Sequence, residues 1–292
     1  MTAIAQDTIS QATPTAPAII RPSVRQHSIK VELSTPAIGA ELSNISLADA
    51  AQDADAIAEI RALWLKHKVL FFRDQPLTSA QHAAFARRFG ELEIHPFLPA
   101  NGEVPEVVRF AKSADVGWYE NGWHHDVTWR ETPSLGAVLH ALDVPPSGGD
   151  TLFSDAYAAL DGLDDDLRQR IDDLVAVHDF VHVCGHTMGE EKLAEMRAKH
   201  PPVQHPVVIT HEVTGKDLLY LNRFFAPRQP EADGTLRDRD ESRELMNRLC
   251  RSFEPVEHQV RFRWEPESVA FWDNPAVPHY SLLSTYPSPR QS

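Results

Sequence analysis

The chain has 292 residues, of which 42% are hydrophobic and 24% are charged, a composition typical of a soluble globular protein with one sizeable core. The 28 Lys and Arg residues against 42 Asp and Glu residues give a formal net charge of −14, which argues against binding to nucleic acid or to an anionic membrane surface. Two isolated cysteines exclude a disulfide framework and a cysteine-based zinc site. No signal peptide or membrane-length apolar run is apparent, so we expect a cytoplasmic protein.

The N-terminal part begins with a polar tail and continues as mixed strands and helices. Residues 1–27 are rich in Thr, Ala, Pro and Gln and lack apolar periodicity, which predicts a disordered tail. We expect residues 28–292 to form one domain. Apolar spacing and capping residues predict a strand over 27–34, a helix over 53–68, a buried strand over 68–77 and a helix over 78–89.

The rest of the chain is richer in short strands. Alternating or continuous apolar runs predict strands over 106–111, 125–129, 136–144, 207–213, 217–221, 258–264 and 268–274. Helices are predicted over 154–174, 189–199 and 238–252. Strands near both ends with helices between them indicate an α+β fold with a double-stranded β-helix (jelly-roll) core and helical insertions.

The segment WHHDVTW (123–129) carries the strongest local signal for chemistry. On an extended strand, residues two apart share a face, so His124 and Asp126 can converge on one cation while His125 points away. A His-x-Asp pair alone also occurs by chance on surface strands. His279 follows a predicted strand and is the candidate for a third ligand. Two imidazoles and one carboxylate on one face of an iron leave positions open for substrate and dioxygen.

Several blocks of sequence, taken in order, resemble the taurine dioxygenase (TauD/TfdA) family of Fe(II)/2-oxoglutarate-dependent dioxygenases. The resemblance extends from about Ile29 to Arg290. Its blocks are IGAELSNISL (38–47), KVLFFRDQPLT (68–78), FGELEIHPF (89–97), WHHDVTW (123–129), PPSGGDTLF (145–153), HPVVITHEVTGKDLLYLN (205–222) and FWDNPAVPHY (271–280). The family includes taurine dioxygenase and phenoxyacetate dioxygenases.

The resemblance implies a role for each matching position. His124, Asp126 and His279 match the iron ligands. Thr151 matches the hydroxyl that contacts the distal carboxylate of 2-oxoglutarate, and Arg290, eleven residues beyond His279, matches the arginine that pairs with the same carboxylate. The implied cofactor is Fe(II), with 2-oxoglutarate and dioxygen as co-substrates. Because the carboxylate ligand is present, we expect hydroxylation with release of succinate and CO₂.

Three further positions match the substrate pocket of taurine dioxygenase: His95, Val127 and Phe225. Other pocket positions depart from that enzyme and argue against taurine itself. They are Leu98, Glu120 and the pair Val183-Cys184. We therefore expect a small organic anion, such as a sulfonate, a sulfate ester or a carboxylate.

Alternatives to this function remain open at the level of sequence. They are a tailoring hydroxylase of an amino acid or natural product, a non-catalytic jelly-roll binding protein, and a zinc hydrolase with the same triad. The resemblance also implies a homo-oligomer, either a dimer or a tetramer. Family members continue past the 2-oxoglutarate arginine into a strand with a substrate-binding arginine, whereas this sequence ends at Ser292. We therefore expect the C-terminal strand to be missing or truncated.

Overall fold

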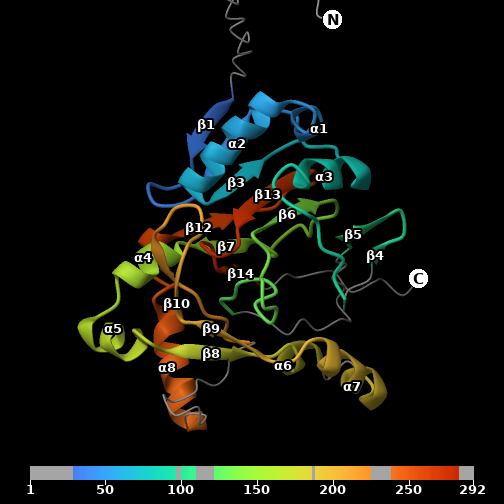
Figure 1. Ribbon diagram of the computed structural model, residues 1–292. Coiled ribbons are helices and arrows are strands. Elements are labelled where there is room, and N and C mark those ends of the chain that lie inside the picture. Colours follow the sequence, from blue (N-terminus) through green and yellow to red (C-terminus); the bar gives the residue numbers. More distant parts are fainter. Residues whose placement is uncertain (1–28, 97–99, 110–121, 186–187, 225–237, 283–292) are drawn as a thin grey trace, which may run out of the picture.

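Two β-sheets form the centre of the molecule in the computed structural model (Figure 1). The structure describes residues 29–96, 100–109, 122–185, 188–224 and 238–282. The predicted N-terminal tail and two predicted site residues, Phe225 and Arg290, lie outside these ranges.

The larger sheet has five strands in the order β1-β2-β3-β13-β6. Their bounds are β1 Lys30–Leu33, β2 Ala40–Ser43, β3 Val69–Phe72, β13 Ser268–Asp273 and β6 Gly136–Ala141. β2 and β3 run parallel, and the other pairs are antiparallel. β3 is buried throughout, as its continuous apolar run predicts.

The two faces of this sheet pack against different partners. Leu70 and Phe72 face the N-terminal helices, whereas Val69 and Phe71 face the second sheet, because alternate residues of a strand point to opposite sides. The helices are α1 Leu47–Ala50, α2 Ala54–His67 and α3 Ser79–Ala86. α2 is capped by the Asp53 carboxylate, and α3 begins with a capping box at Thr78, the residue predicted to cap that helix.

The second sheet has three strands in the order β12-β7-β14 and carries part of the candidate site. The strands are β12 Gln259–Phe262, β7 Thr151–Ser154 and β14 His279–Ser281. Phe71 of the first sheet stacks on Phe262 with ring centroids 4.2 Å apart, and it lies 5.6 Å from Phe153. These aromatic contacts hold the two sheets face to face, in agreement with a mixed helix-and-sheet fold.

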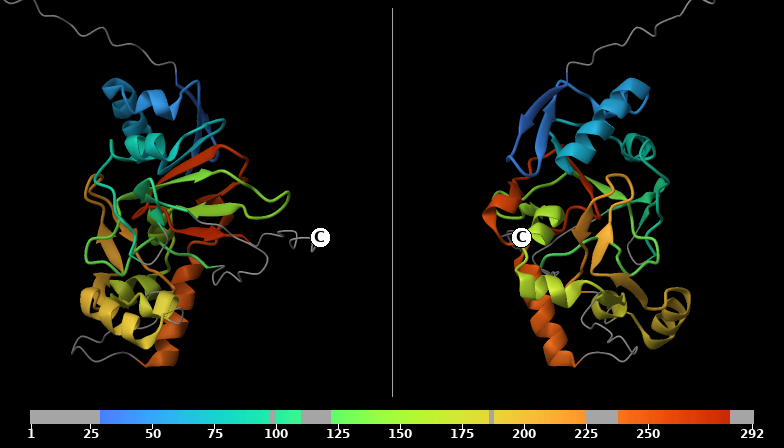
Figure 2. Two further views of the ribbon diagram at one scale, coloured as in Figure 1. Left: turned by 90° about the vertical axis from the view of Figure 1, so that its right-hand side faces the viewer. Right: turned by 60° about the vertical axis from the view of Figure 1, so that its left-hand side comes forward.

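The remaining elements surround this centre (Figures 1 and 2). Three two-stranded sheets are formed by β4 Ala100–Asn101 with β5 Val104–Val108, β8 Val175–His178 with β9 Val203–Pro206, and β10 Val208–Thr210 with β11 Asp217–Leu219. The helices are α4 Ala156–Asp161, α5 Asp165–Ile171, α6 Val181–Cys184, α7 Glu190–Lys199, α8 Arg239–Arg251 and the 3-10 turn η2 Val256–His258. None of the helices in the described ranges has the length and apolar character needed to cross a membrane.

Two predicted elements differ from the structure. Residues 125–129 form a turn rather than a strand, and Val127 has a φ of 48° that no extended strand tolerates. The helix predicted over 154–174 is two short helices, α4 and α5. The first residue of that range, Ser154, belongs to β7, and the break follows Gly162, which ends α4.

Candidate metal centre

His124 and His279 are brought together by direct backbone pairing. The His124 N–H donates to the His279 carbonyl at 3.1 Å, and the His279 N–H donates to the His124 carbonyl at 2.8 Å. His279 begins β14, so this bridge attaches the HHD segment to the edge of the three-stranded sheet. The two imidazole centroids lie 4.2 Å apart.

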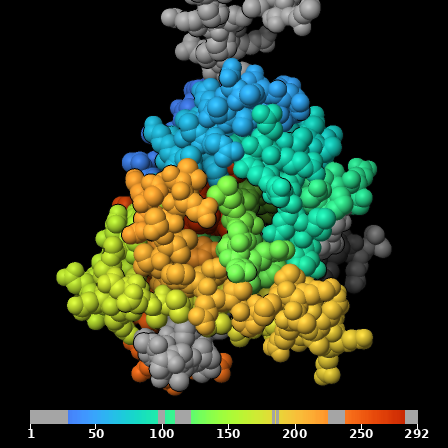
Figure 3. All heavy atoms as spheres, in the orientation of Figure 1, coloured from blue at the N-terminus to red at the C-terminus, as the bar shows by residue number. Residues whose placement is uncertain are grey.

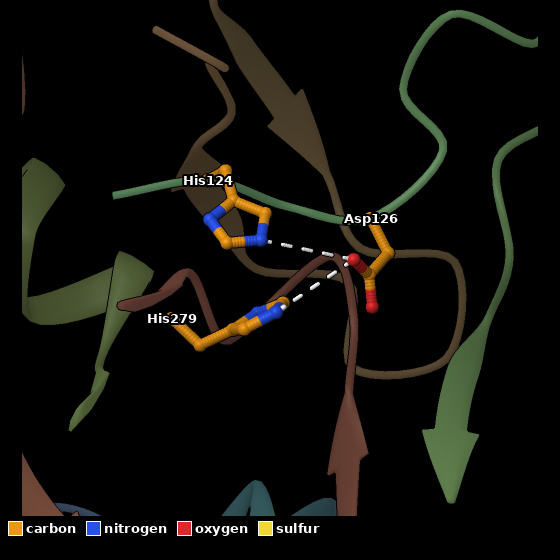
Figure 4. Close-up of side chains that lie close together, drawn as sticks. All are labelled: His124, Asp126 and His279. Atoms are coloured by element: carbon orange, nitrogen blue, oxygen red, sulfur yellow. Dashed lines mark ion pairs between the residues drawn. The ribbon is translucent and has the colours of Figure 1, made fainter. Parts of the chain in front are cut away.

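Asp126 completes a triad with these histidines (Figure 4). Its Oδ1 lies 3.9 Å from His124 Nε2 and 3.6 Å from His279 Nε2. One ligand atom from each residue falls within 4.8 Å of the others. Both imidazoles point their Nε2 atoms toward the carboxylate in Figure 4, so three donor atoms converge on one point although the segment is a turn.

The protonation of the triad fits a divalent cation. His124 Nδ1 lies 3.0 Å from the Gly122 carbonyl. A proton on Nδ1 donates to that carbonyl and leaves the Nε2 lone pair free for a metal. Burial holds the pKa of His279 well below its usual range, with His124 as the next cause, so its imidazole is neutral. Burial also raises the pKa of Asp126, a shift that a bound cation would reverse.

The donor set of two imidazoles and one carboxylate, without a thiolate, fits Fe(II) with open positions. It is the one group of at least three candidate ligands within the described ranges. The Asp126 side chain keeps 37% of its surface exposed, compared with 17% for His124 and 11% for His279. The triad is therefore accessible from the carboxylate side.

Asn274, which the sequence did not single out, holds Asp126 in place. Its Oδ1 accepts from the Asp126 N–H at 2.8 Å, and its Nδ2 donates to the carbonyls of Asp126 and Ser134 at 3.0 Å each. The side chain is fully buried. The available signal was its place directly after β13 in the FWDN block, five residues before His279.

Thr151 lies on the same face of the three-stranded sheet as His279. Thr151 pairs with Ser281 and Phe153 pairs with His279, so the two positions are one side-chain repeat apart, about 7 Å along the strand. Thr151 is buried and lines a cavity of about 950 Å³ together with Ser281 and Trp264. The cavity also extends along β6 to α3. Figure 3 shows the surface hollowed between the light green segment near residue 130 and the teal segment that follows α3.

Two of the three predicted substrate positions are described. His95 lies near Trp129, with ring centroids 6.1 Å apart. The pKa of His95 is lowered to about 4, mainly by burial and also by Arg130, while Asp126 acts in the opposite direction, which fits a position on the carboxylate side of the triad. Val127 packs with Trp129 against Phe180.

His125 is structural, as the sequence predicts. It is fully buried, and its Nδ1 lies 2.9 Å from the Leu221 carbonyl. Asn222 Nδ2 donates to the His125 carbonyl at 2.7 Å. The residue between the two ligands therefore fastens the turn to the chain after β11.

Comparison with known proteins matches the chain to one family over almost its full length. The family model for "Taurine catabolism dioxygenase TauD, TfdA family" matches residues 30–290. An alkylsulfatase of Acinetobacter baylyi is 32% identical over 85% of this chain and 78% of the relative. An alpha-ketoglutarate-dependent sulfate ester dioxygenase of Pseudomonas putida is 31% identical over 90% of this chain and 88% of the relative.

Solved structures agree with this match. The crystal structure of a taurine dioxygenase from Burkholderia xenovorans superposes with a TM-score of 0.72 at 33% identity, covering 88% of this chain and 83% of that one. The matched range contains the triad and Thr151. The chain belongs to the TauD/TfdA family of 2-oxoglutarate-dependent dioxygenases.

Proposed function

We propose that the chain hydroxylates a small organic anion at an Fe(II) ion held by His124, Asp126 and His279, with a sulfate ester or sulfonate as the first substrate class to test. The observation that carries this proposal is the convergence of two imidazole nitrogens and one carboxylate oxygen within 4.8 Å. The support for the substrate class is the likeness to an alkylsulfatase and to a sulfate ester dioxygenase. As a family member, the chain is an oxidoreductase that uses Fe(II), 2-oxoglutarate and dioxygen.

The residues of the chain divide the work of the site. When bound, Fe(II) and 2-oxoglutarate supply the oxidising power that places one oxygen atom of O₂ in a C–H bond, while 2-oxoglutarate leaves as succinate and CO₂. His124 and His279 offer imidazole nitrogens, and Asp126 supplies the negative charge. Thr151 and Arg290 hold the distal carboxylate of 2-oxoglutarate, since a hydroxyl and a guanidinium both donate to carboxylate oxygens.

His95, Val127 and Phe225 form the substrate side of the proposed site. His95 is neutral at pH 7 because burial lowers its pKa to about 4, so it binds an anion by hydrogen bonding rather than by charge. Val127 lies next to the Asp126 ligand and supplies an apolar wall. Hydroxylation of the carbon next to a sulfate or sulfonate group would break the C–O or C–S bond and yield an aldehyde or ketone.

We also propose that the two sheets are the halves of a double-stranded β-helix. The face-to-face aromatic contacts between them and the position of the triad at the edge of the smaller sheet support this topology.

We further propose that the protein is cytoplasmic and forms a dimer or tetramer. Burial raises the pKa of the Cys250 thiol to about 12, which leaves it unreactive. Light scattering during size-exclusion chromatography tests the oligomeric state.

The function is tested by succinate release. The chain is loaded anaerobically with Fe(II), supplied with 2-oxoglutarate and oxygen, and offered alkyl sulfates, sulfonates, phenoxyacetates, amino acids and neutral alcohols. We expect succinate and an aldehyde or ketone in equal amounts with one of the anions. Turnover that persists without 2-oxoglutarate and oxygen would indicate a hydrolase instead. The proposal would be overturned if, with every compound offered, the wild-type protein released no more succinate than the Asp126→Ala variant.

A further inference from the structure

The geometry points to Trp264 as a positioning residue for 2-oxoglutarate, acting through the hydroxyl of Thr151. Its indole N–H occupies a lone pair of that hydroxyl and thereby turns the hydroxyl proton toward the carboxylate of the co-substrate. The inference rests on the proposed function, because it assumes that Thr151 contacts 2-oxoglutarate. It adds a residue that neither the sequence blocks nor the triad singled out.

The contact between the two side chains is direct and enclosed. Trp264 Nε1 lies 3.0 Å from Thr151 Oγ1. Trp264 is 7% exposed and Thr151 is 8% exposed, so water does not compete freely for either atom. Thr151 is paired with Phe262 of β12, and Trp264 follows two residues later with its ring 4.8 Å from that of Phe262. The strand pairing therefore fixes the indole beside Thr151.

The direction of this hydrogen bond has a chemical consequence. An indole N–H can only donate, so Thr151 Oγ1 must accept. A hydroxyl has one proton and two lone pairs, and one lone pair is now in use. Within the described ranges no recorded hydrogen bond uses the Thr151 hydroxyl proton, which is left to donate to another acceptor. A carboxylate is the acceptor that gains most from such a donor.

The position of the pair fits a dicarboxylate bound between the metal centre and Thr151. Both side chains line the cavity of about 950 Å³, as does Ser281. Thr151 lies one side-chain repeat from His279 on the same sheet face, so a ligand anchored at the triad by one end meets Thr151 at its other end. Trp264 lines the same cavity and, by donating to Thr151, leaves the hydroxyl proton as the group that this end of the ligand meets.

The test is Trp264→Phe, which keeps an aromatic ring and removes the N–H. We expect the dissociation constant for 2-oxoglutarate to rise on the order of tenfold, the effect of losing one oriented hydrogen bond to a charged group. It is measured by calorimetric titration of the anaerobic Fe(II) protein. At saturating 2-oxoglutarate, kcat and the KM for the organic substrate should be unchanged. Trp64→Phe is the matched control: Trp64 lines the same cavity, but its indole N–H is buried without a hydrogen-bond partner in the described structure, so the change removes an N–H that positions nothing.

A double-mutant cycle separates this role from a packing effect. In the Thr151→Val background the hydroxyl is absent, so Trp264→Phe should weaken 2-oxoglutarate binding no further. Additive losses, or a Trp264→Phe protein that binds 2-oxoglutarate like the wild type, would overturn the inference while leaving the proposed function intact. A wild-type protein that binds no 2-oxoglutarate would overturn both.

An independent readout uses the wild-type chain. In the Zn(II)-substituted protein, the Trp264 indole N–H signal in ¹⁵N–¹H spectra should shift on addition of 2-oxoglutarate and should remain protected from solvent exchange. A Trp264 signal that is insensitive to saturating 2-oxoglutarate would count against the inference, and this measurement does not depend on whether the variants fold.

Discussion

Asp126 is the anionic member of the triad, and burial raises its pKa. Replacing it with Ala removes the charge that holds a divalent cation, so we expect Fe(II) affinity to fall by about 100-fold or more and hydroxylation to be lost. The metal-free variant should be at least as stable as the metal-free wild type, because the raised pKa of Asp126 shows that its ionised form is disfavoured in the folded chain. Metal content after dialysis and the Tm of the apoprotein check both parts. Retained iron in the variant would contradict the metal assignment.

Two tyrosines form a matched pair for a test of buried hydroxyls. The Tyr220 hydroxyl is buried without a hydrogen-bond partner in the described structure, and burial raises its pKa. The Tyr157 hydroxyl lies 3.0 Å from Thr214 Oγ1. Tyr220→Phe should leave the Tm unchanged or raise it, whereas Tyr157→Phe should cost about 1 kcal/mol. Equal losses in thermal or urea unfolding would show that Tyr220 has a partner after all.

At the scale of elements, Asn274 connects the end of β13 to the turn that carries Asp126. Asn274→Ala removes the acceptor of the Asp126 N–H and the donor to the carbonyls of Asp126 and Ser134. We expect Fe(II) affinity to fall about 10- to 100-fold, as is usual when a group that orients a metal ligand is lost. Ser242→Ala on α8 is a buried control, whose hydroxyl has no recorded partner in the described structure. An Asn274→Ala protein with wild-type metal affinity would show that the turn keeps its conformation without the Asn274 side chain.

The elements also show where sequence patterns were sufficient. α2 was predicted within one residue at each end, because its apolar periodicity is local, and β3 was predicted at its start but ends at Phe72, five residues before the predicted end. β7 and β14 were not predicted, since four and three residues give too little periodicity and they are stabilised by pairing with strands distant in sequence. The turn at Asp126 was misread as a strand, because β-branched Val127 adopts a positive φ that local propensity disfavours.

The three candidate metal ligands of the sequence analysis do lie together in the structure. His124 and Asp126 are close in sequence, and His279 was the candidate third ligand because it follows a predicted strand, a position that the block resemblance then matched to an iron ligand. Asn274 and Trp264 could not be predicted, because each acts through a contact created by the sheet register. Sequence therefore identified the chemical groups, while the groups that orient them required the fold.

At the scale of the whole molecule, buried histidines make stability depend on pH. Burial lowers the pKa of His178 to about 3, below the value of about 6.5 expected in the unfolded chain. Below pH 6.5 His178 therefore binds a proton in the unfolded state but not in the folded state. The free energy of unfolding decreases as the pH falls toward 3. His178→Leu should remove about 2 kcal/mol of the stability loss between pH 7 and pH 5. Urea unfolding at both pH values measures this, and an unchanged pH dependence would refute it.

The backbone bridge between His124 and His279 joins positions 155 residues apart. Such a contact closes a long loop, so the binding geometry depends on the native topology. A ligand that binds only this closed form lowers the population of opened forms by a factor that grows with the ratio of its concentration to its Kd. The amide hydrogens of His124 and His279 should therefore exchange with solvent more slowly as the triad binds its metal. Their exchange rates measure the occupancy of the metal centre.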